Sequence, residues 1–211
     1  MTLSFRSGKA LAVAAICLAA IAIGCAPSNS IPKGTDYKNK MVVSVKDQRM
    51  LLVSNGIPVK SYKVSTSKYG LGDQPGSYRT PLGRMQVAQK IGHRAPLGSV
   101  FKSRRRTGEI LRPNAKGRDP IVTRIIWLKG TEYRNRNAFN RKIYIHGTTE
   151  ERRLGYPVSY GCIRMGSRDV RDLFNRVGYG ADLFVIRGSI KDKSQDETAA
   201  LISRLKAGTR G

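Results

Sequence analysis

The residue types that build metal centres are scarce in this chain. Its 211 residues include three cysteines and two histidines. These form neither a CxxC pair nor an HExxH pattern, the spacings typical of zinc sites. A glycine-rich phosphate-binding loop and an internal repeat are also missing. The sequence therefore predicts no metal and no cofactor, and it lacks the pattern of a P-loop protein or of a solenoid.

Acidic residues are the second shortage. Fourteen Asp and Glu stand against 39 Lys and Arg, which gives a net charge of +25. Such a surplus indicates anionic surroundings, such as nucleic acid, a membrane face or an acidic wall polymer, but it says nothing about the fold. Residues 84–142 hold sixteen Lys and Arg against three acidic residues, and are densest at Arg104-Arg-Arg106. This segment is either a basic rim that recruits an anionic polymer or a solvated loop.

Long hydrophobic runs are the third shortage, and the one run that stands out is short. Ala10 to Ile23 is apolar at all fourteen positions and follows Arg6 and Lys9. It is too short to span a bilayer comfortably and fits the apolar core of a signal peptide, with a buried core helix as the alternative. We therefore expect export from the cytoplasm, which argues against a nucleic-acid partner.

Two routes of signal cleavage are open. Ala22-Ile-Gly-Cys25 resembles a lipobox, in which the cysteine is acylated and becomes the mature N-terminus, although leucine is more usual at the position of Ala22. The signal peptide would then be residues 1–25, with a lipid on Cys25 as membrane anchor. Plain cleavage after Ala26, with Gly24 and Ala26 as the small pair, is the competing prediction.

Export leaves one cysteine in the folded domain. Cys17 leaves with the signal, and Cys25 is lipidated or removed. Cys162 then has no intramolecular disulfide partner, so it is either a free reactive thiol or an intermolecular link. A free cysteine also packs as a small hydrophobe. The polar, glycine-containing flank Ser159-Tyr-Gly161 argues against a simple core position.

The rest of the chain has the pattern of one mostly-β domain. Residues 26–39 are polar and predict a tether, residues 40–188 predict the domain, and residues 189–211 predict a charged tail with helical spacing at Leu201, Ile202 and Leu205. Predicted strands are Met41–Val45, Arg49–Val53, Ile57–Ser65, Arg84–Gln89, Pro120–Lys129, Lys142–His146 and Ala181–Ile186. The pattern also predicts a turn at Asn55-Gly56, a buried Trp127, a surface-loop His93, and a helix over Arg168–Val177 with Ser167 as its N-cap and Gly178 after it.

Two short segments carry the candidate chemistry. His146 ends the predicted strand Lys142–His146, and Cys162 lies sixteen residues further on. A thiol attacks a carbonyl carbon well only as the thiolate, and the pKa of a free cysteine is about 8.5. A neighbouring imidazole can take the proton and later return it to a leaving amine. The spacing therefore permits a Cys/His nucleophile pair.

These segments also carry a family resemblance. Ile145-His-Gly-Thr148 together with Ser159-Tyr-Gly-Cys-Ile-Arg-Met165 resembles the L,D-transpeptidase (YkuD-like) catalytic domain, over roughly Lys40 to Gly188. The resemblance implies a mostly-β fold, a β-sandwich with one or two short helices. It also implies a role in cell wall biogenesis and cell shape, as a periplasmic or membrane-anchored protein that faces the wall. Members of the family cleave peptidoglycan stem peptides before a terminal D-alanine, form a thioester, and transfer the acyl group to an amine.

The resemblance assigns a role to each matching residue. Cys162 would be the nucleophile, His146 the base, and Gly147 would orient the ring through its carbonyl group. The backbone N–H groups of Tyr160, Gly161 and Cys162 would face the oxyanion, Ser159 would brace the loop, and Arg164 would hold a substrate carboxylate or the loop itself. Tyr160 stands where many members have a second histidine, so His146 is the one nearby base.

The acyl acceptor stays open at this point. It is a second stem peptide, the lysine of a wall-attached protein, or water. Two other functions also remain: a cysteine wall endopeptidase, and a non-catalytic basic lipoprotein that binds the wall. In wall endopeptidases the cysteine precedes the histidine, and here the order of His146 and Cys162 is reversed.

Overall fold

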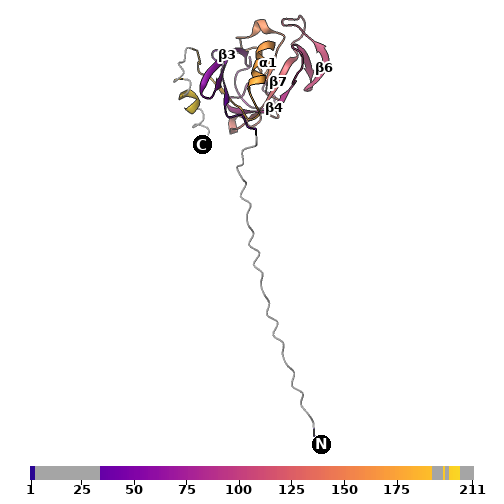
Figure 1. Ribbon diagram of the computed structural model, residues 1–211, viewed down its shortest axis with the longest axis vertical. Coiled ribbons are helices and arrows are strands. Elements are labelled where there is room, and N and C mark those ends of the chain that lie inside the picture. Colours follow the sequence, from indigo (N-terminus) through magenta and orange to yellow (C-terminus); the bar gives the residue numbers. More distant parts are fainter. Residues whose placement is uncertain (3–33, 192–196, 198–199, 205–211) are drawn as a thin grey trace. The chain divides into compact units, whose positions relative to one another are not determined.

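A computed structural model describes residues 1–2, 34–191, 197 and 200–204 (Figure 1). Residues 3–25 of the predicted signal sequence, with its lipobox, and the first part of the tether lie outside the described residues, as does Leu205 of the tail. The helices within the described part of the chain are too short or too polar to serve as membrane spans. All named helices and strands belong to one compact unit, residues 32–211.

Strands dominate this unit, as the short apolar-rich runs of the sequence predict. They are β1 (Asn39–Ser44), β2 (Arg49–Ser54), β3 (Ile57–Ser65), β4 (Gly83–Ile91), β5 (Ser99–Lys102), β6 (Arg105–Ile110), β7 (Ile121–Gly130), β8 (Tyr144–Gly147), β9 (Ile163–Met165) and β10 (Asp182–Ile186). One α-helix, α1 (Ser167–Arg176), and two 3-10 turns, η1 (Tyr133–Asn135) and η2 (Glu151–Arg153), complete the named elements. The prediction of a mostly-β domain with one or two short helices is confirmed.

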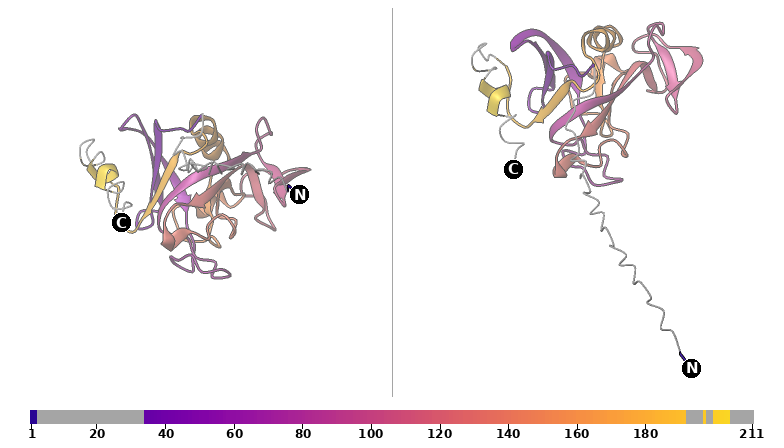
Figure 2. Two further views of the ribbon diagram at one scale, coloured as in Figure 1. Left: turned by 90° about the horizontal axis from the view of Figure 1, so that it is seen from below. Right: turned by 60° about the horizontal axis from the view of Figure 1, so that its bottom comes forward.

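The sheet closes on itself, so the prediction of a β-sandwich is wrong. The strand order is β4-β10-β1-β2-β3-β9-β8-β7-β5-β6, and β4 also pairs with β7. The closure depends on β4, which pairs with β10 through residues 83–86 and with β7 through residues 85–91. Its register with β7 shifts between Val87 and Gln89, an irregularity of the kind that bends a strand. Eight strands thus form a barrel, and the β5–β6 hairpin extends from β7 (Figure 2).

The barrel interior is filled by alternate residues of all eight strands. Met41 of β1 lies opposite Leu183 of β10 on one side and Leu52 of β2 on the other, and each is fully buried. Because side chains alternate between the two faces of a strand, one apolar face of each strand suffices to build this core. Helix α1 adds Val170, Leu173 and Phe174 to the same cluster.

Core truncation gives a direct test of this packing. Ile126 of β7 is fully buried, whereas Ile57 of β3 is 53% exposed. We expect Ile126→Ala to lower the free energy of unfolding by about 3 kcal/mol, since the lost methyl groups leave a cavity. The matched change Ile57→Ala should cost less than about 0.5 kcal/mol. Urea unfolding followed by circular dichroism measures both, and equal costs would contradict the placement of Ile126 inside the barrel.

Both ends of helix α1 differ slightly from the prediction. Ser167 is the first residue of the helix and Gly166 occupies the cap position. The Ser167 N–H donates to Glu151 Oε1 at 2.7 Å, so a carboxylate from η2 serves the helix N-terminus that the Ser167 hydroxyl was expected to cap. The helix ends at Arg176, one residue before the predicted end.

Two local predictions can be compared directly. Asn55 and Gly56 have φ values of 51° and 87°, as a tight hairpin turn between β2 and β3 requires. In the tail, Ala200 to Arg204 are helical, and Ile202 packs with Val42, Val53 and Ile190.

Candidate active site

The parallel pairing of β8 with β9 places the two predicted reactive residues near each other in adjacent segments. His146 lies opposite Arg164, and Ile145 lies opposite Ile163, so Cys162 falls level with Tyr144. Side chains two residues apart on a strand share a face, which puts Tyr144, His146 and Cys162 on the outer side of the barrel wall. Strand spacing and rise place the Cα atoms of His146 and Cys162 about 8 Å apart. Their side chains can therefore meet.

His146 is held in one tautomer. Its ring is buried, with 6% exposed, and Nδ1 lies 2.9 Å from the carbonyl oxygen of Gly147. A carbonyl oxygen only accepts, so Nδ1 carries the hydrogen and Nε2 keeps a free lone pair. Burial lowers the pKa of His146 to about 4, and the charge of Arg164 acts in the same direction. The ring is thus a neutral base at neutral pH.

Cys162 has a protonated thiol at rest. Its Sγ accepts from the Tyr144 N–H at 3.4 Å and lies 3.4 Å from the carbonyl oxygen of Lys142. Burial raises the pKa of the Cys162 thiol to about 11, against the opposing effects of the Tyr144 N–H and of Arg164 and Arg141. The pair therefore consists of a neutral thiol and a neutral imidazole, and a thiolate forms when the proton moves.

The loop before Cys162 is fixed by Ser159, which is fully buried. Its hydroxyl donates to the Cys162 carbonyl at 2.6 Å and accepts from the Gly161 N–H at 3.2 Å. The second bond engages one of the three predicted oxyanion donors. Gly161 has a φ of 115°, and an added Cβ would lie 3.3 Å from the carbonyl oxygen of Arg79. Glycine is therefore required there both for its conformation and for space.

Arg164 is paired within the protein. Its Nη1 lies 2.9 Å from Asp119 Oδ2 and 3.1 Å from Glu150 Oε2, and the residue is 9% exposed. Of its two expected roles, this arrangement matches holding the loop better than binding a substrate carboxylate. Asp119 also accepts from the Thr148 hydroxyl and the Thr149 N–H. The segment after His146 is thereby tied to β9, the strand that directly follows Cys162.

Asp119 and Glu150 were missed by sequence reasoning. Asp119 is one of three acidic residues in the basic segment 84–142. The available signal was the isolation of this carboxylate among many cations, because a carboxylate in such surroundings is expected to pair with one of them. The geometry shows which arginine it serves, and nothing in the spacing of Asp119 and Arg164 along the chain indicates that pair.

The Asp119 pair predicts a pH-dependent contribution to stability. Hydrogen bonds from Thr148 and Thr149 and the charge of Arg164 outweigh burial and lower the pKa of Asp119. A lowered folded-state pKa stabilises the fold above the unfolded pKa of about 3.8, and that contribution is lost as the pH falls through the folded value. We expect Asp119→Asn to cost about 3 kcal/mol at pH 7 and clearly less at pH 3.

Urea unfolding at the two pH values measures this difference. The matched control is Glu109→Gln, since Glu109 pairs with Arg118 at the surface and belongs to the same basic segment. An exposed pair is worth at most about 1 kcal/mol. Equal costs for the two variants at pH 7 would contradict a structural role for Asp119.

Aromatic rings form the wall beside Cys162. Trp127 stacks on Phe139 with ring centroids 4.2 Å apart and meets Tyr144 edge-on at 5.4 Å. Trp127 is 9% exposed, so its prediction as a buried residue is confirmed. Arg104, at the tip of the β5–β6 hairpin, lies over the Trp127 ring at 4.9 Å, whereas Arg105 and Arg106 are exposed. The arginine cluster Arg104–Arg106 thus contributes one cation to this aromatic wall and exposes the other two to solvent.

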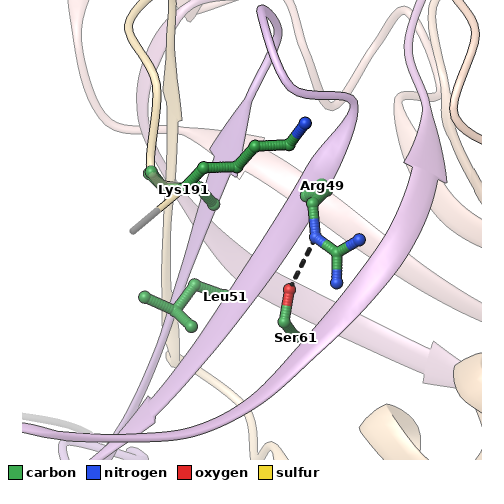
Figure 3. Close-up of a pocket in the computed structure, with 5 residues that line it drawn as sticks. Arg49, Leu51, Ser61 and Lys191 are labelled. Carbon is green, nitrogen blue, oxygen red and sulfur yellow. Dashed lines mark hydrogen bonds between the residues drawn. The ribbon is translucent and has the colours of Figure 1, made fainter. Parts of the chain in front are cut away.

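A pocket elsewhere contains none of the predicted site residues (Figure 3). It encloses about 370 Å³ and is lined by Arg49, Leu51, Ser61, Ile190 and Lys191. Arg49 Nε donates to Ser61 Oγ at 3.0 Å. His93 lies exposed in a turn, as predicted. Within the part of the chain that the structure describes, no group of three or more His, Cys, Asp and Glu side chains is arranged to hold a metal.

Comparison with known proteins gives a family and a set of similar structures. The family model of the L,D-transpeptidase catalytic domain (YkuD) matches residues 38–186. No curated protein matches. An L,D-transpeptidase from Mycobacterium smegmatis is 13% identical, with 71% of this chain and 58% of that chain covered and a TM-score of 0.46.

Two further solved structures are similar to the same extent. An L,D-transpeptidase from Mycobacterium tuberculosis H37Rv is 18% identical, with 71% of this chain and 57% of that chain covered and a TM-score of 0.46. An L,D-transpeptidase from Xylanimonas cellulosilytica is 17% identical, with 74% of this chain and 63% of that chain covered and a TM-score of 0.46. This chain spans less than two thirds of each of the three structures. The family match covers most of the chain, so the chain belongs to the L,D-transpeptidase catalytic domain (YkuD) family.

Proposed function

We propose that the chain is an L,D-transpeptidase that acts on peptidoglycan stem peptides through a thioester at Cys162. The observation that carries the proposal is the parallel pairing of β8 and β9. This pairing supports a thiol within reach of an imidazole whose Nε2 keeps its lone pair for a proton, inside a domain of this family. The family match supports transpeptidase chemistry, and the arrangement of Cys162 and His146 supports the covalent route.

Acylation begins with the sulfur of Cys162. Sγ attacks the carbonyl carbon of the bond before the terminal D-alanine while His146 Nε2 takes the thiol proton. The N–H groups of Tyr160 and Cys162 meet the resulting oxyanion, and each such donor is worth about 3 kcal/mol. Gly161 N–H joins them only if it releases Ser159 Oγ. The intermediate collapses, the imidazolium returns its proton to the leaving amine, and D-alanine departs.

Transfer then runs the same steps in reverse. The acceptor amine attacks the thioester carbonyl and gives its proton to His146. The sulfur leaves and recovers that proton, which restores the neutral pair. The acceptor is an amine of a second stem peptide, the lysine of a wall-attached protein, or water. When water is the acceptor, the thioester is hydrolysed and the product is a free tripeptide.

Arg164 acts on both partners without touching the substrate. Its charge lowers the pKa of Cys162, which favours the thiolate, and lowers the pKa of His146, which disfavours the imidazolium. Asp119 opposes the second effect, since its carboxylate raises the pKa of His146. We infer that the ion pair keeps His146 basic enough to accept the proton while the thiolate stays stabilised.

Such a function requires the domain to lie outside the cytoplasm. The apolar run Ala10–Ile23 supports export, and a lipid on Cys25 would hold the protein at the membrane, facing the wall. Plain cleavage after Ala26 would instead release it into the periplasm. Both routes give Cys162 access to stem peptides.

Intact-protein mass spectrometry tests the function. The chain is incubated with a tetrapeptide stem that ends in D-alanine. We expect release of D-alanine and a mass increase of one acylated tripeptide, mapped to Cys162 and absent from Cys162→Ala. A non-catalytic wall-binding protein would give neither signal. A wall endopeptidase would cleave a cross-linked dimer without releasing D-alanine, and either result would overturn the proposal.

A further inference from the structure

Three exposed tyrosines gather beside the cysteine loop. Tyr69 is 46% exposed, Tyr78 57% and Tyr160 53%. Their ring centroids lie 5.7 to 6.0 Å apart, and each ring contacts the other two. Tyr69 and Tyr78 belong to the segment between β3 and β4, and Tyr160 precedes the nucleophile by two residues. We call these three residues the tyrosine platform.

A lysine keeps the tyrosine platform polar. Lys68 Nζ lies 4.7 Å from the ring centre of Tyr160 and 5.1 Å from that of Tyr69, and it donates to the Tyr160 hydroxyl at 3.3 Å. The hydrogen bond to Tyr160 raises the pKa of Lys68, so its side chain is charged at neutral pH. The platform therefore offers aromatic faces next to a fixed cation and three hydroxyl groups.

Buried hydrogen bonds lock the backbone that carries the rings. Ser67 Oγ donates to the Tyr78 carbonyl and accepts from the Tyr69 N–H at 2.9 Å. The Lys68 N–H donates to the Ser159 carbonyl at 3.1 Å, next to Tyr160. Ser67 is 4% exposed. The backbone that carries the three rings is therefore fixed before any ligand arrives, which reduces the entropy lost on binding.

Thr80 links the tyrosine platform to the nucleophile loop. The residue is fully buried, and its hydroxyl accepts from the Ser67 N–H and donates to the Gly161 carbonyl, both at 3.0 Å. A ligand held on the platform is thus held at a fixed position relative to Cys162.

Tyr78 also adopts an unfavourable backbone conformation. Its φ is 56°, in the left-handed region that bulky residues rarely occupy. Such strain persists where the surroundings enforce it, and it gathers at ligand sites. A glycine or asparagine would relieve the strain at this position, yet a tyrosine is present. This favours a use for the ring itself.

We propose that the tyrosine platform binds pyranose rings of the glycan strand that bears the stem peptide. The inference rests on the proposed function and adds a saccharide subsite to it. A pyranose presents C–H groups on its faces and hydroxyls on its rim. Tyrosine rings match the first, and their hydroxyls with Lys68 match the second. The saccharide then lies next to the loop that receives its peptide.

The same features argue against a protein partner at this surface. A stable protein interface buries roughly 800 Å² per partner around an apolar centre. Three half-exposed tyrosines with a lysine ammonium among them provide a smaller and wetter surface. They suit a narrow, hydroxyl-rich chain better than a protein face.

Binding to peptide-free glycan tests the subsite apart from catalysis. The variant combines Tyr69→Ala with Tyr78→Asn, since asparagine accepts a positive φ. The matched control is Tyr179→Ala, which removes a tyrosine that is 55% exposed and lies outside the tyrosine platform. The probe is glycan strands from which an amidase has removed the stem peptides. Calorimetry should show a dissociation constant about tenfold higher for the double variant, and no change for the control.

Kinetics with two donors completes the test. With a disaccharide-tetrapeptide donor, the double variant should show a KM about tenfold higher and an unchanged kcat, whereas the free tetrapeptide should give wild-type values. Tyr69→Ala alone should give a smaller shift in the same direction. An unchanged glycan affinity overturns the proposal, and so does an equal KM shift for both donors, which would assign the platform to the peptide. Failure of every donor to acylate Cys162 would refute the proposed function while leaving the glycan measurement valid.

Discussion

Replacing His146 by alanine is expected to slow acylation of Cys162 about 10³-fold. A positioned general base contributes roughly 10² to 10⁴ in rate. We expect a loss of rate in the upper part of that range, because burial raises the pKa of the Cys162 thiol to about 11 and leaves almost no thiolate at pH 7. No second histidine stands next to Cys162, since Tyr160 occupies that place and His93 lies in an exposed turn. The single-turnover rate of thioester formation, followed by intact mass, measures the effect.

The fold should survive the change. The His146 side chain makes its hydrogen bond to its own neighbour, the carbonyl of Gly147, and it lies on the outer face of β8, away from the barrel interior. The other histidine supplies the matched control: His93→Ala should acylate at the wild-type rate. A folded His146→Ala protein with full activity would refute the pairing of the two residues. Melting curves for both variants separate a lost base from a lost fold.

Local patterns in the sequence identified most of the elements. The short, apolar-rich runs Met41–Val45 and Ala181–Ile186 predict strands, and the structure pairs the two strands in parallel in the barrel. Asn55-Gly56 predicts its turn, because that pair tolerates positive φ at both positions. These signals are local, since each depends on the conformation of a few consecutive residues.

Closure of the barrel and the β5–β6 hairpin were not predictable in this way. Closure requires β4 to pair with β7, some forty residues away, and a strand pattern does not name its partners. The hairpin turns at Ser103 and Arg104, with φ values of 49° and 66°. Neither residue is a usual choice for positive φ, so no turn signal was present. The sequence showed a cluster of arginines there, and the structure shows a hairpin tip that reaches Trp127.

In the candidate site, too, some residues were predictable from a local motif and others are brought together only by the pairing of distant strands. His146, Cys162 and the loop Ser159–Gly161 follow from the spacing of one motif and from the family it resembles. The carboxylates that hold Arg164 do not, because Asp119 is 45 residues before it in the chain and is set beside it only by the pairing of β7, β8 and β9. The tyrosine platform is a similar case. Its rings come from two segments, and exposed tyrosines carry no periodic signal.

The neutral resting state of the pair predicts a steep pH profile for alkylation. With the pKa of Cys162 at about 11 and that of His146 at about 4, raising the pH from 7 to 10 should increase the rate of iodoacetamide labelling by about 10³-fold, tenfold per unit. The sign follows from the thiol: its pKa is raised, so the reactive thiolate accumulates only as the pH approaches 11. Between pH 5 and 9 the imidazole is already neutral and contributes no charge to stabilise a thiolate.

A preformed thiolate–imidazolium pair would behave in the opposite way. It would give a plateau that begins near pH 5 and a labelling rate at pH 7 above that of an ordinary thiol. The reference is a short unfolded peptide of the sequence Ser-Tyr-Gly-Cys-Ile-Arg, whose thiol should titrate near its usual pKa of about 8.5 and level off above about pH 9.5. We expect Cys162 to react more slowly than this peptide at pH 7 and still to be gaining rate at pH 10. Mass spectrometry resolves both rates, and the contrast shows whether the proton leaves sulfur before the substrate binds or during its attack.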